Sequence, residues 1–90
     1  MKRIYKYKIP VEDYVEIDLP EGAKVLSFQC QREAPVIWAL VDPGAPPQKR
    51  RFRFAGTGHS INEATENLSF IGTAQMASGA LIRHLFEMLE

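Results

Sequence analysis

The stretch Val36-Ile37-Trp38-Ala39-Leu40-Val41 decides the fold class, because it carries no polar residue on either of its alternating faces. Successive side chains of a strand point to opposite sides, so such a strand needs cover on both and belongs at the centre of a sheet or sandwich. The next residues, Asp42-Pro43-Gly44-Ala45-Pro46-Pro47, cannot continue the ladder because three of them are prolines, which lack a backbone donor. We therefore expect a central strand followed by a stiff, exposed loop.

Two alternating segments at the start of the chain, residues 3–9 and 15–19, are typical of the two strands of a hairpin. One register makes a wholly apolar face and also sets opposite charges across from each other. It pairs Ile9 with Val15, Tyr7 with Ile17, Tyr5 with Leu19, Lys8 with Glu16 and Lys6 with Asp18. After a turn at Pro20-Glu21-Gly22, residues 24–31 predict a third strand whose apolar face holds Leu26, Phe28 and Cys30.

Downstream of the proline loop, residues 49–54 alternate Arg51 and Arg53 against Phe52 and Phe54, which predicts a strand with one basic and one aromatic face. A long polar connection follows, with a short helical turn expected near residues 60–66, and residues 68–75 resume as a strand. The last segment, 80–90, fits both periods: helical propensity favours a helix, whereas the short turn at 77–79 favours a final strand at an edge or interface.

Together these patterns predict an all-β fold: a small antiparallel β-sandwich or barrel-like domain of about six or seven strands, in one domain over residues 1–90. Hydrophobic residues make up 46% of the 90 positions, enough for one compact core, and a chain this small gains stability from a second copy. We therefore expect a homo-oligomer, most simply a dimer.

Charge and cysteine content narrow the function classes. Eleven basic side chains balance eleven acidic ones, so no global field steers the chain to nucleic acid or to an anionic membrane. The single cysteine cannot form an internal disulfide, and the sequence contains neither a signal-peptide pattern nor an apolar span. We expect a cytoplasmic protein with no cofactor, no membrane partner and no strong nucleic-acid signal.

Several short phrases spread along the chain resemble a family of short bacteriophage and prophage proteins. They are Ile4-Tyr5-Lys6-Tyr7, Leu19-Pro20-Glu21-Gly22-Ala23-Lys24, Trp38-Ala39-Leu40-Val41-Asp42-Pro43, Arg51-Phe52-Arg53-Phe54, Gly56-Thr57-Gly58-His59, Phe70-Ile71-Gly72-Thr73 and Gly79-Ala80-Leu81 with His84-Leu85-Phe86-Glu87. The resemblance implies a viral accessory protein with a mostly β fold and a strand as its last segment. It implies no catalytic residues. Because small phage accessory proteins often blunt host defence, it suggests a counter-defence role.

The strongest local chemistry is an anion site made by Arg51 and Arg53 together with Gly56, Thr57, Gly58 and His59. Arginines two positions apart on a strand point to the same side, about 7 Å apart, and both can hold one phosphate. Backbone amides of a glycine loop approach phosphate closely, although this loop lacks the Gly-Lys-Ser/Thr ending of a nucleotide-binding P-loop. The alternative is that the arginines pair with acidic residues of the first hairpin or with a second subunit.

No catalytic or metal site is predicted. His59 has no convincing partner, and Cys30 lies in phase with core residues, which argues against a Cys–His dyad. His84, between Ile82 and Phe86, is more typical of a satisfied core or interface histidine than of a ligand, and Trp38 is expected in the core.

The sequence therefore favours a non-enzymatic phage protein that binds and sequesters or occludes a component of host immunity. Its partner would be an anionic nucleotide signal or a host defence protein. Two rivals are a small virion or assembly component and a small phosphoesterase that uses His59.

Overall fold

The computed structural model describes residues 1–89, which form seven β-strands and one 3-10 turn. The strands are β1 (Arg3–Lys8), β2 (Tyr14–Pro20), β3 (Lys24–Gln31), β4 (Ala34–Val41), β5 (Pro47–Gly56), β6 (Leu68–Met76) and β7 (Leu81–Met88), and the turn η1 covers Thr65–Asn67. The predicted all-β class is confirmed. The final segment is a strand, as the resemblance implied.

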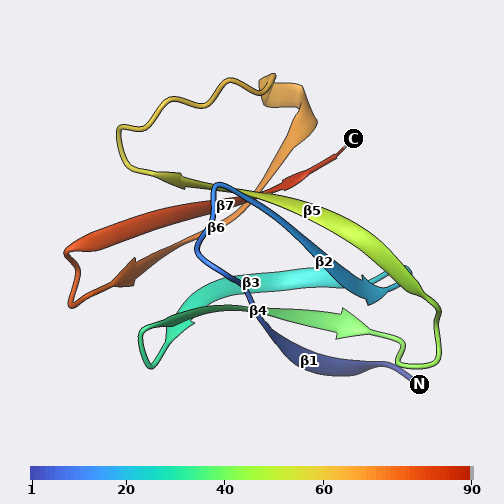
Figure 1. Ribbon diagram of the computed structural model, residues 1–90. Coiled ribbons are helices and arrows are strands. Elements are labelled where there is room, and N and C mark those ends of the chain that lie inside the picture. Colours follow the sequence, from blue (N-terminus) through green and yellow to red (C-terminus); the bar gives the residue numbers. More distant parts are fainter. Residues whose placement is uncertain (90) are drawn as a thin grey trace.

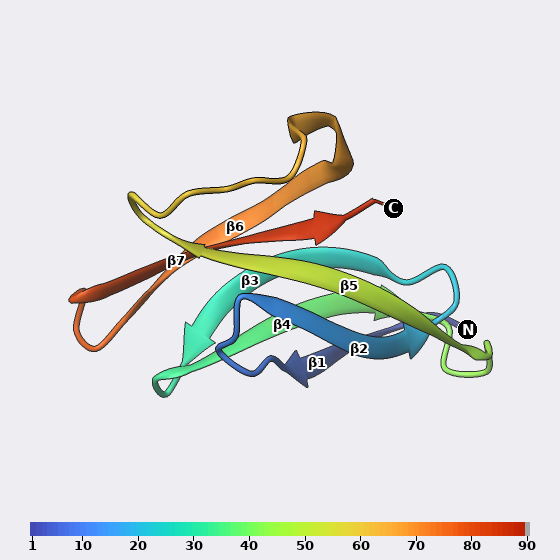
Figure 2. The ribbon, with the colours of Figure 1, turned by 45° about the horizontal axis from the view of Figure 1, so that its top comes forward.

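Two antiparallel sheets make up the fold (Figures 1 and 2). The three-stranded sheet has the order β1-β4-β3, and the four-stranded sheet has the order β2-β5-β7-β6. The sheets meet where β3 lies against β6: a Cβ at Gly72 would stand 3.5 Å from the Phe28 carbonyl oxygen. We call this the closed side of the sandwich. The edges of β1 and β2 form the open side, and residues 9–13 connect them.

The predicted hairpin between the first two strands is wrong, because they belong to different sheets. β1 pairs with β4, where Tyr7 lies opposite Ile37, and β2 pairs with β5, where Val15 lies opposite Phe52. β4 is apolar on both faces, so it gains most from having a strand on each side, and β1 takes one of those places. The complementary register of the first two strands is left unused inside the chain.

The core lies between the sheets and is built from the inward faces of both. Phe28 of β3 and Phe54 of β5 join the two layers in an edge-to-face contact, with ring centroids 5.5 Å apart. The buried cluster is completed by Ile9, Val15, Leu19, Ala23, Ile37, Ala39, Val41, Phe52, Ala74 and Leu85. The predicted central position of 36–41 is confirmed, although Trp38 lies on the outer face of β4 and is only partly buried.

Two details depart from the alternation of the sequence. A bulge between Val25 and Ser27 shifts the register of β3 and leaves Leu26 43% exposed, so Leu26 does not share the core face of Phe28. The last strand is not at an edge, because β7 lies between β5 and β6. Its inward residue Leu85 is fully buried, and Ile82, Phe86 and Met88 on the opposite face are partly buried.

Side-chain contacts fasten the closed side. Arg50 and Glu87 form a two-pronged ion pair, and Arg50 also donates to the Ala23 carbonyl at 2.8 Å. At the far end, the Glu33 carboxylate accepts a 2.6 Å hydrogen bond from the Ala77 amide, tying the β3–β4 turn to the β6–β7 turn. Both residues of this contact, Glu33 and Ala77, have positive φ, a backbone conformation that costs conformational energy in a residue other than glycine.

The connections follow their local chemistry. The proline loop is exposed and turns at Asp42, whose carboxylate accepts from the Gly44 amide at 3.1 Å. The 3-10 turn falls at Thr65–Asn67, close to the helical turn expected near 60–66. Among residues 1–89, no helix is long and apolar enough to cross a membrane.

Candidate ligand-binding site

The outer face of the four-stranded sheet carries the arginines that the sequence singled out. Arg51 and Arg53 both point outward from β5, opposite the buried rings of Phe52 and Phe54, as the alternation predicts. Their environments differ sharply: Arg51 is exposed, whereas Arg53 is only 7% exposed. The two guanidiniums therefore do not form one open anion clamp.

Arg53 fastens the long connection to the sheet. Its Nε donates to Glu63 at 3.1 Å, one terminal nitrogen donates to the Ser60 carbonyl at 3.1 Å, and the other donates to the Phe54 carbonyl. The guanidinium also lies 4.8 Å from the centre of the Tyr14 ring, a cation–π contact. These partners use the donors that a phosphate would need. Arg53 does pair with an acidic residue, but Glu63 lies in the long connection and not in the first hairpin, where the alternative expected the partner.

Tyr14 and Glu63 complete this fastening. The Tyr14 hydroxyl donates to the Glu63 carboxylate. This bond, together with those from Arg53, lowers the pKa of Glu63 below its usual value of 4.5. The same bond raises the pKa of Tyr14 above its usual value of 10.0, because ionising the phenol would place two negative charges together. The Tyr14 ring is thus fixed in place while 53% of its surface stays open to ligand.

The glycine loop lies beyond the arginines rather than beside Arg51. Gly56 stands five positions after Arg51, roughly 16 Å along β5. The His59 amide donates to the Gly56 carbonyl at 3.1 Å to close a turn, and Gly58 has the positive φ of 87° that favours glycine. The His59 ring packs on Gly56, where an added Cβ would stand 2.7 Å from its Cε1.

Thr57 serves a different partner that the sequence did not reveal. Its hydroxyl lies 2.8 Å from Nε2 of His84, and the Thr73 hydroxyl lies 2.8 Å from Nδ1 of the same ring. Both ring nitrogens of His84 therefore have hydrogen-bond partners, as expected of a satisfied histidine. Three of the phrases that carry the family resemblance meet at this point. No sequence spacing links Thr57, Thr73 and His84, so only the fold could bring them together.

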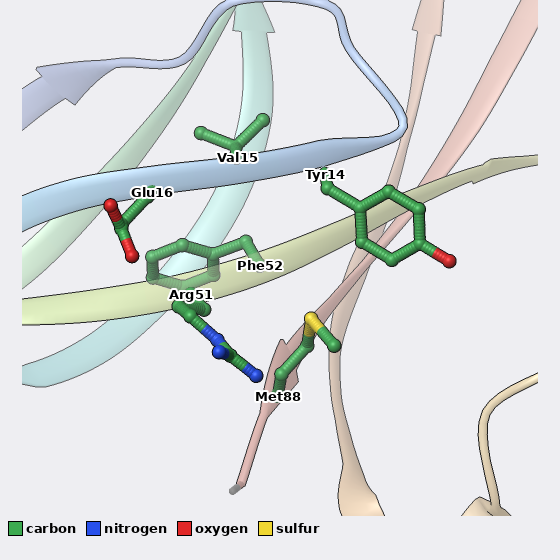
Figure 3. A pocket seen from close by; sticks show the side chains of 6 residues that line it. All are labelled: Tyr14, Val15, Glu16, Arg51, Phe52 and Met88. Carbon is green, nitrogen blue, oxygen red and sulfur yellow. The ribbon is translucent and has the colours of Figure 1, made fainter.

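A hollow of about 400 Å³ lies beside Arg51 on the same face (Figure 3). Its exposed or partly exposed side chains come from three strands, and it is lined by Tyr14, Val15, Glu16, Arg51, Phe52 and Met88. Arg51 and Glu16 are directly opposed on β5 and β2. Figure 3 shows the Arg51 and Met88 side chains near each other, with the Tyr14 ring to one side and Glu16 to the other.

These residues supply a combination suited to a small ligand with a flat ring and a negative group. A base or similar ring can stack on Tyr14, the Arg51 guanidinium can hold an anion, and the Glu16 carboxylate can accept from hydroxyl or amino groups. The site predicted from the sequence does not include Tyr14, Glu16 or Met88. The predicted strand begins at residue 15, which puts Tyr14 in the preceding connection, and nothing in the sequence shows that β2 lies beside β5.

A second hollow, of about 410 Å³, opens on the outer face of the three-stranded sheet. It is lined by Lys6, Lys8, Gln31, Arg32, Ala34 and Val36, and none of these side chains is aromatic. Its cations are exposed, and Lys6 donates to Gln31 at 2.6 Å. It offers charge without a stacking surface, so the hollow beside Arg51 is the better site for a nucleotide-like ligand.

Metal chemistry has no obvious place in the part of the chain that the structure describes. Within residues 1–89, no three His, Cys, Asp or Glu side chains cluster closely enough to hold an ion. Cys30 is partly buried and packs against the core, as its phase with Phe28 predicted.

Comparison with known proteins identifies the family of this chain. Residues 1–90 match the family model described as "Domain of unknown function (DUF7352)", and the chain belongs to that family. Neither the curated proteins nor the solved structures contain a match to this sequence.

Proposed function

We propose that this DUF7352 member is a non-enzymatic binding protein that sequesters a small, phosphate-bearing ligand with an aromatic ring, such as a nucleotide immune signal. The observation that carries the proposal is the hollow in which the fixed ring of Tyr14 and the exposed guanidinium of Arg51 lie together. Stacking on an aromatic side chain contributes about 1–3 kcal/mol per base, and a hydrogen bond to a charged group about 1.5–3 kcal/mol. Together these two contributions correspond to an affinity between roughly ten millimolar and a few tens of micromolar, so tight capture also needs the remaining contacts in the hollow.

Binding without turnover is supported by where the histidines lie. His84 is held between two threonines, and His59 packs on Gly56 at the end of β5, away from the hollow. Neither lines the hollow beside Arg51, which argues against the phosphoesterase that would use His59 there.

The biological setting of the proposal rests on the resemblance of the sequence phrases to phage proteins. A phage protein made in the host cytoplasm would act there by lowering the free concentration of a nucleotide signal. Sequestration needs only tight binding and enough copies, which suits a small domain.

The direct test is titration calorimetry with AMP and cyclic di-AMP, with adenosine and inorganic phosphate titrated separately. We expect a nucleotide to bind more tightly than either fragment, and Arg51→Ala and Tyr14→Ala each to weaken binding about tenfold or more. Lys24→Ala, a cation on the other sheet, is the matched control. Mass spectrometry of the incubated nucleotide should show it unchanged. Binding that survives Arg51→Ala would contradict the site, and hydrolysis abolished by His59→Ala would favour the phosphoesterase.

Docking on a host defence protein is a second candidate, favoured by one observation. Trp38 and Leu40 are only partly covered on the outer face of the three-stranded sheet, and the neighbouring Ile4 is 59% exposed. If this face docks on a protein, Trp38→Ala should abolish protection of the phage while nucleotide binding stays unchanged. A small virion component would instead be found in purified particles.

A further inference from the structure

The open side of the sandwich leaves two strand edges without a partner. Among residues 1–89, β1 pairs only with β4 and β2 pairs only with β5, so each has one edge to which no strand is bonded. The opposite side is closed by β3 against β6. An unpaired edge is a template for another strand, and natural proteins either blunt such an edge or use it.

Two hydrogen bonds fix which backbone groups point to these edges. The Ile9 amide donates to the Pro35 carbonyl at 3.1 Å, and the Phe54 amide donates to the Asp13 carbonyl at 2.9 Å. Bonded pairs alternate along an antiparallel ladder, so the odd-numbered residues of both strands face their own sheets. The even-numbered residues, among them Lys6, Lys8, Glu16 and Asp18, therefore direct their N–H and C=O groups to the open edges.

The side chains at the two edges are complementary. Lys6 and Lys8 are exposed on β1, and Glu16 and Asp18 are exposed on β2. Inside the sandwich, the same edges leave Tyr5 41% exposed, and Tyr7 and Ile17 only partly buried. Lysines oppose pairing of β1 with another β1, and the acidic residues oppose pairing of β2 with another β2. Pairing of β1 with β2 joins opposite charges.

We propose that a second copy of this chain occupies the open side, with β1 of each copy pairing antiparallel to β2 of the other. The register sets Lys8 opposite Glu16 and Lys6 opposite Asp18, so the free N–H and C=O groups of the even-numbered residues meet. It also sets Tyr7 opposite Ile17 in the core. This is the complementarity that the sequence shows for a hairpin and that the fold leaves unused within one chain.

Symmetry allows the arrangement. A two-fold axis parallel to the strands exchanges the two layers of the sandwich while keeping each core face inward. The three-stranded sheet of one copy then continues into the four-stranded sheet of the other, and the same joint occurs twice. The dimer closes both open sides, so no further copies are needed.

The dimer also deepens the proposed function, on which this step rests. Lys8 of the second copy would stand across from Glu16, which lines the hollow beside Arg51. Side chains directly opposed on antiparallel strands have Cβ atoms about 4.5–5.5 Å apart. The second copy would thus add a cation at the rim of each hollow and offset the charge of Glu16, favouring an anionic ligand.

A charge exchange tests the pairing, with native mass spectrometry and sedimentation at roughly 50 µM, a concentration suited to micromolar interfaces. We expect a wild-type dimer, and dissociation constants at least about tenfold weaker for Lys6→Glu and for Asp18→Lys, because each sets like charges opposite one another at both joints. An equimolar mixture of the two variants should restore a dimer containing one of each. Lys24→Glu, an exposed charge reversal on β3, should remain dimeric.

Circular dichroism confirms that each variant is folded. If Asp18→Lys does not fold, Asp18→Asn, which only removes the charge, takes its place. A wild-type monomer at this concentration would overturn the proposal, and so would a dimer that neither variant weakens or a mixture that stays monomeric. Arg51→Ala should lose AMP binding yet remain dimeric. Failure of the pairing and failure of the ligand site are thereby told apart.

Discussion

The closed and open sides of the sandwich differ in how their strand edges and apolar side chains are covered. Both are places where two sheets end, with unpaired strand edges and apolar side chains to cover. On the closed side, Phe28 packs on Phe54 across the two layers, and Arg50, which is paired with Glu87 in its own sheet, donates to the Ala23 carbonyl just before β3. On the open side, Tyr5 and Tyr7 stay partly exposed, and the charges on β1 and β2 have opposite signs. The closed side is held together by contacts within the chain, whereas the open side presents complementary charges to a partner.

The difference shows that side-chain complementarity and actual pairing are separate properties. Complementary residues on β1 and β2 do not pair within the chain, because β1 pairs with the apolar strand β4 and β2 pairs with β5, where Glu16 and Asp18 lie opposite Arg51 and Lys49. Energetically, the closed side should dominate the stability of the monomer. The predictions below separate the two sides, from the largest expected effect to the smallest.

Removing an aromatic ring from the closed side should cost most. Phe54→Ala leaves a cavity between the sheets and is expected to lower the free energy of unfolding by about 3–5 kcal/mol. Tyr5→Ala, on the open side, should cost about 1 kcal/mol because its ring is already partly in solvent. Urea titrations at low protein concentration measure both. Equal losses would show that the two sides contribute alike.

Breaking an ion pair on the closed side should also cost more stability than breaking one on the open side. Glu87→Gln leaves Arg50 mostly buried without its carboxylate, and we expect a loss of about 1.5–3 kcal/mol. Lys49→Gln removes an exposed pair with Asp18, whose charged atoms are 3.7 Å apart, and should change stability by less than about 0.5 kcal/mol. A larger loss for Lys49→Gln would reverse the ranking of the two sides.

Acid should release the long connection before it affects either side. The pKa of Glu63 is lowered in the folded chain, so its bonds to Arg53 and Tyr14 contribute fully above about pH 4.5 and are lost as the pH falls through the lower, folded value. Hydrogen exchange should then accelerate across residues 57–67 while the core strands stay protected. Glu63→Gln should show the faster exchange at neutral pH. Uniform exchange at all strands would instead indicate global unfolding.

A small effect that belongs to neither side is expected at the end of β5. Gly56→Ala places a Cβ 2.7 Å from the His59 ring, which is exposed and can swing away, so the loss should stay below about 1 kcal/mol. Adding His59→Ala should recover part of that loss, and an NMR shift of the His59 ring reports its displacement. A large loss that His59→Ala does not recover would place the strain in the backbone.

Alternation along the sequence predicted the strands well and their partners poorly. Phe52 and Phe54 identified β5 because burial follows local periodicity. Pairing depends on which strands are available in three dimensions, so the match of Lys8 to Glu16 predicted a hairpin that the chain does not form. Apolar side chains on both faces of residues 81–86 predicted an edge or interface strand, whereas this strand lies inside the sheet.

The candidate site was predicted only in part, for the same reason. Arg51 lines the hollow, but Arg53 is occupied by Glu63, which stands ten residues later in a segment without periodicity. Tyr14 reaches the site through the pairing of β2 with β5. Local patterns show that a side chain faces outward, and they do not show what meets it there.

Pairing of β1 with β4 sets an order on how the chain can assemble during synthesis. Residues 3–8 leave the ribosome a few seconds before residues 34–41 do, since synthesis proceeds from the N-terminus at about 5–20 residues per second. In that interval the complementary strand nearest to β1 is β2, and short-range contacts form fastest. The nascent chain can therefore hold its first two strands together as a temporary hairpin that shields Tyr5 and Tyr7, then exchange it when β4 and β5 arrive. The same residues would thus pair first within one chain and later between two.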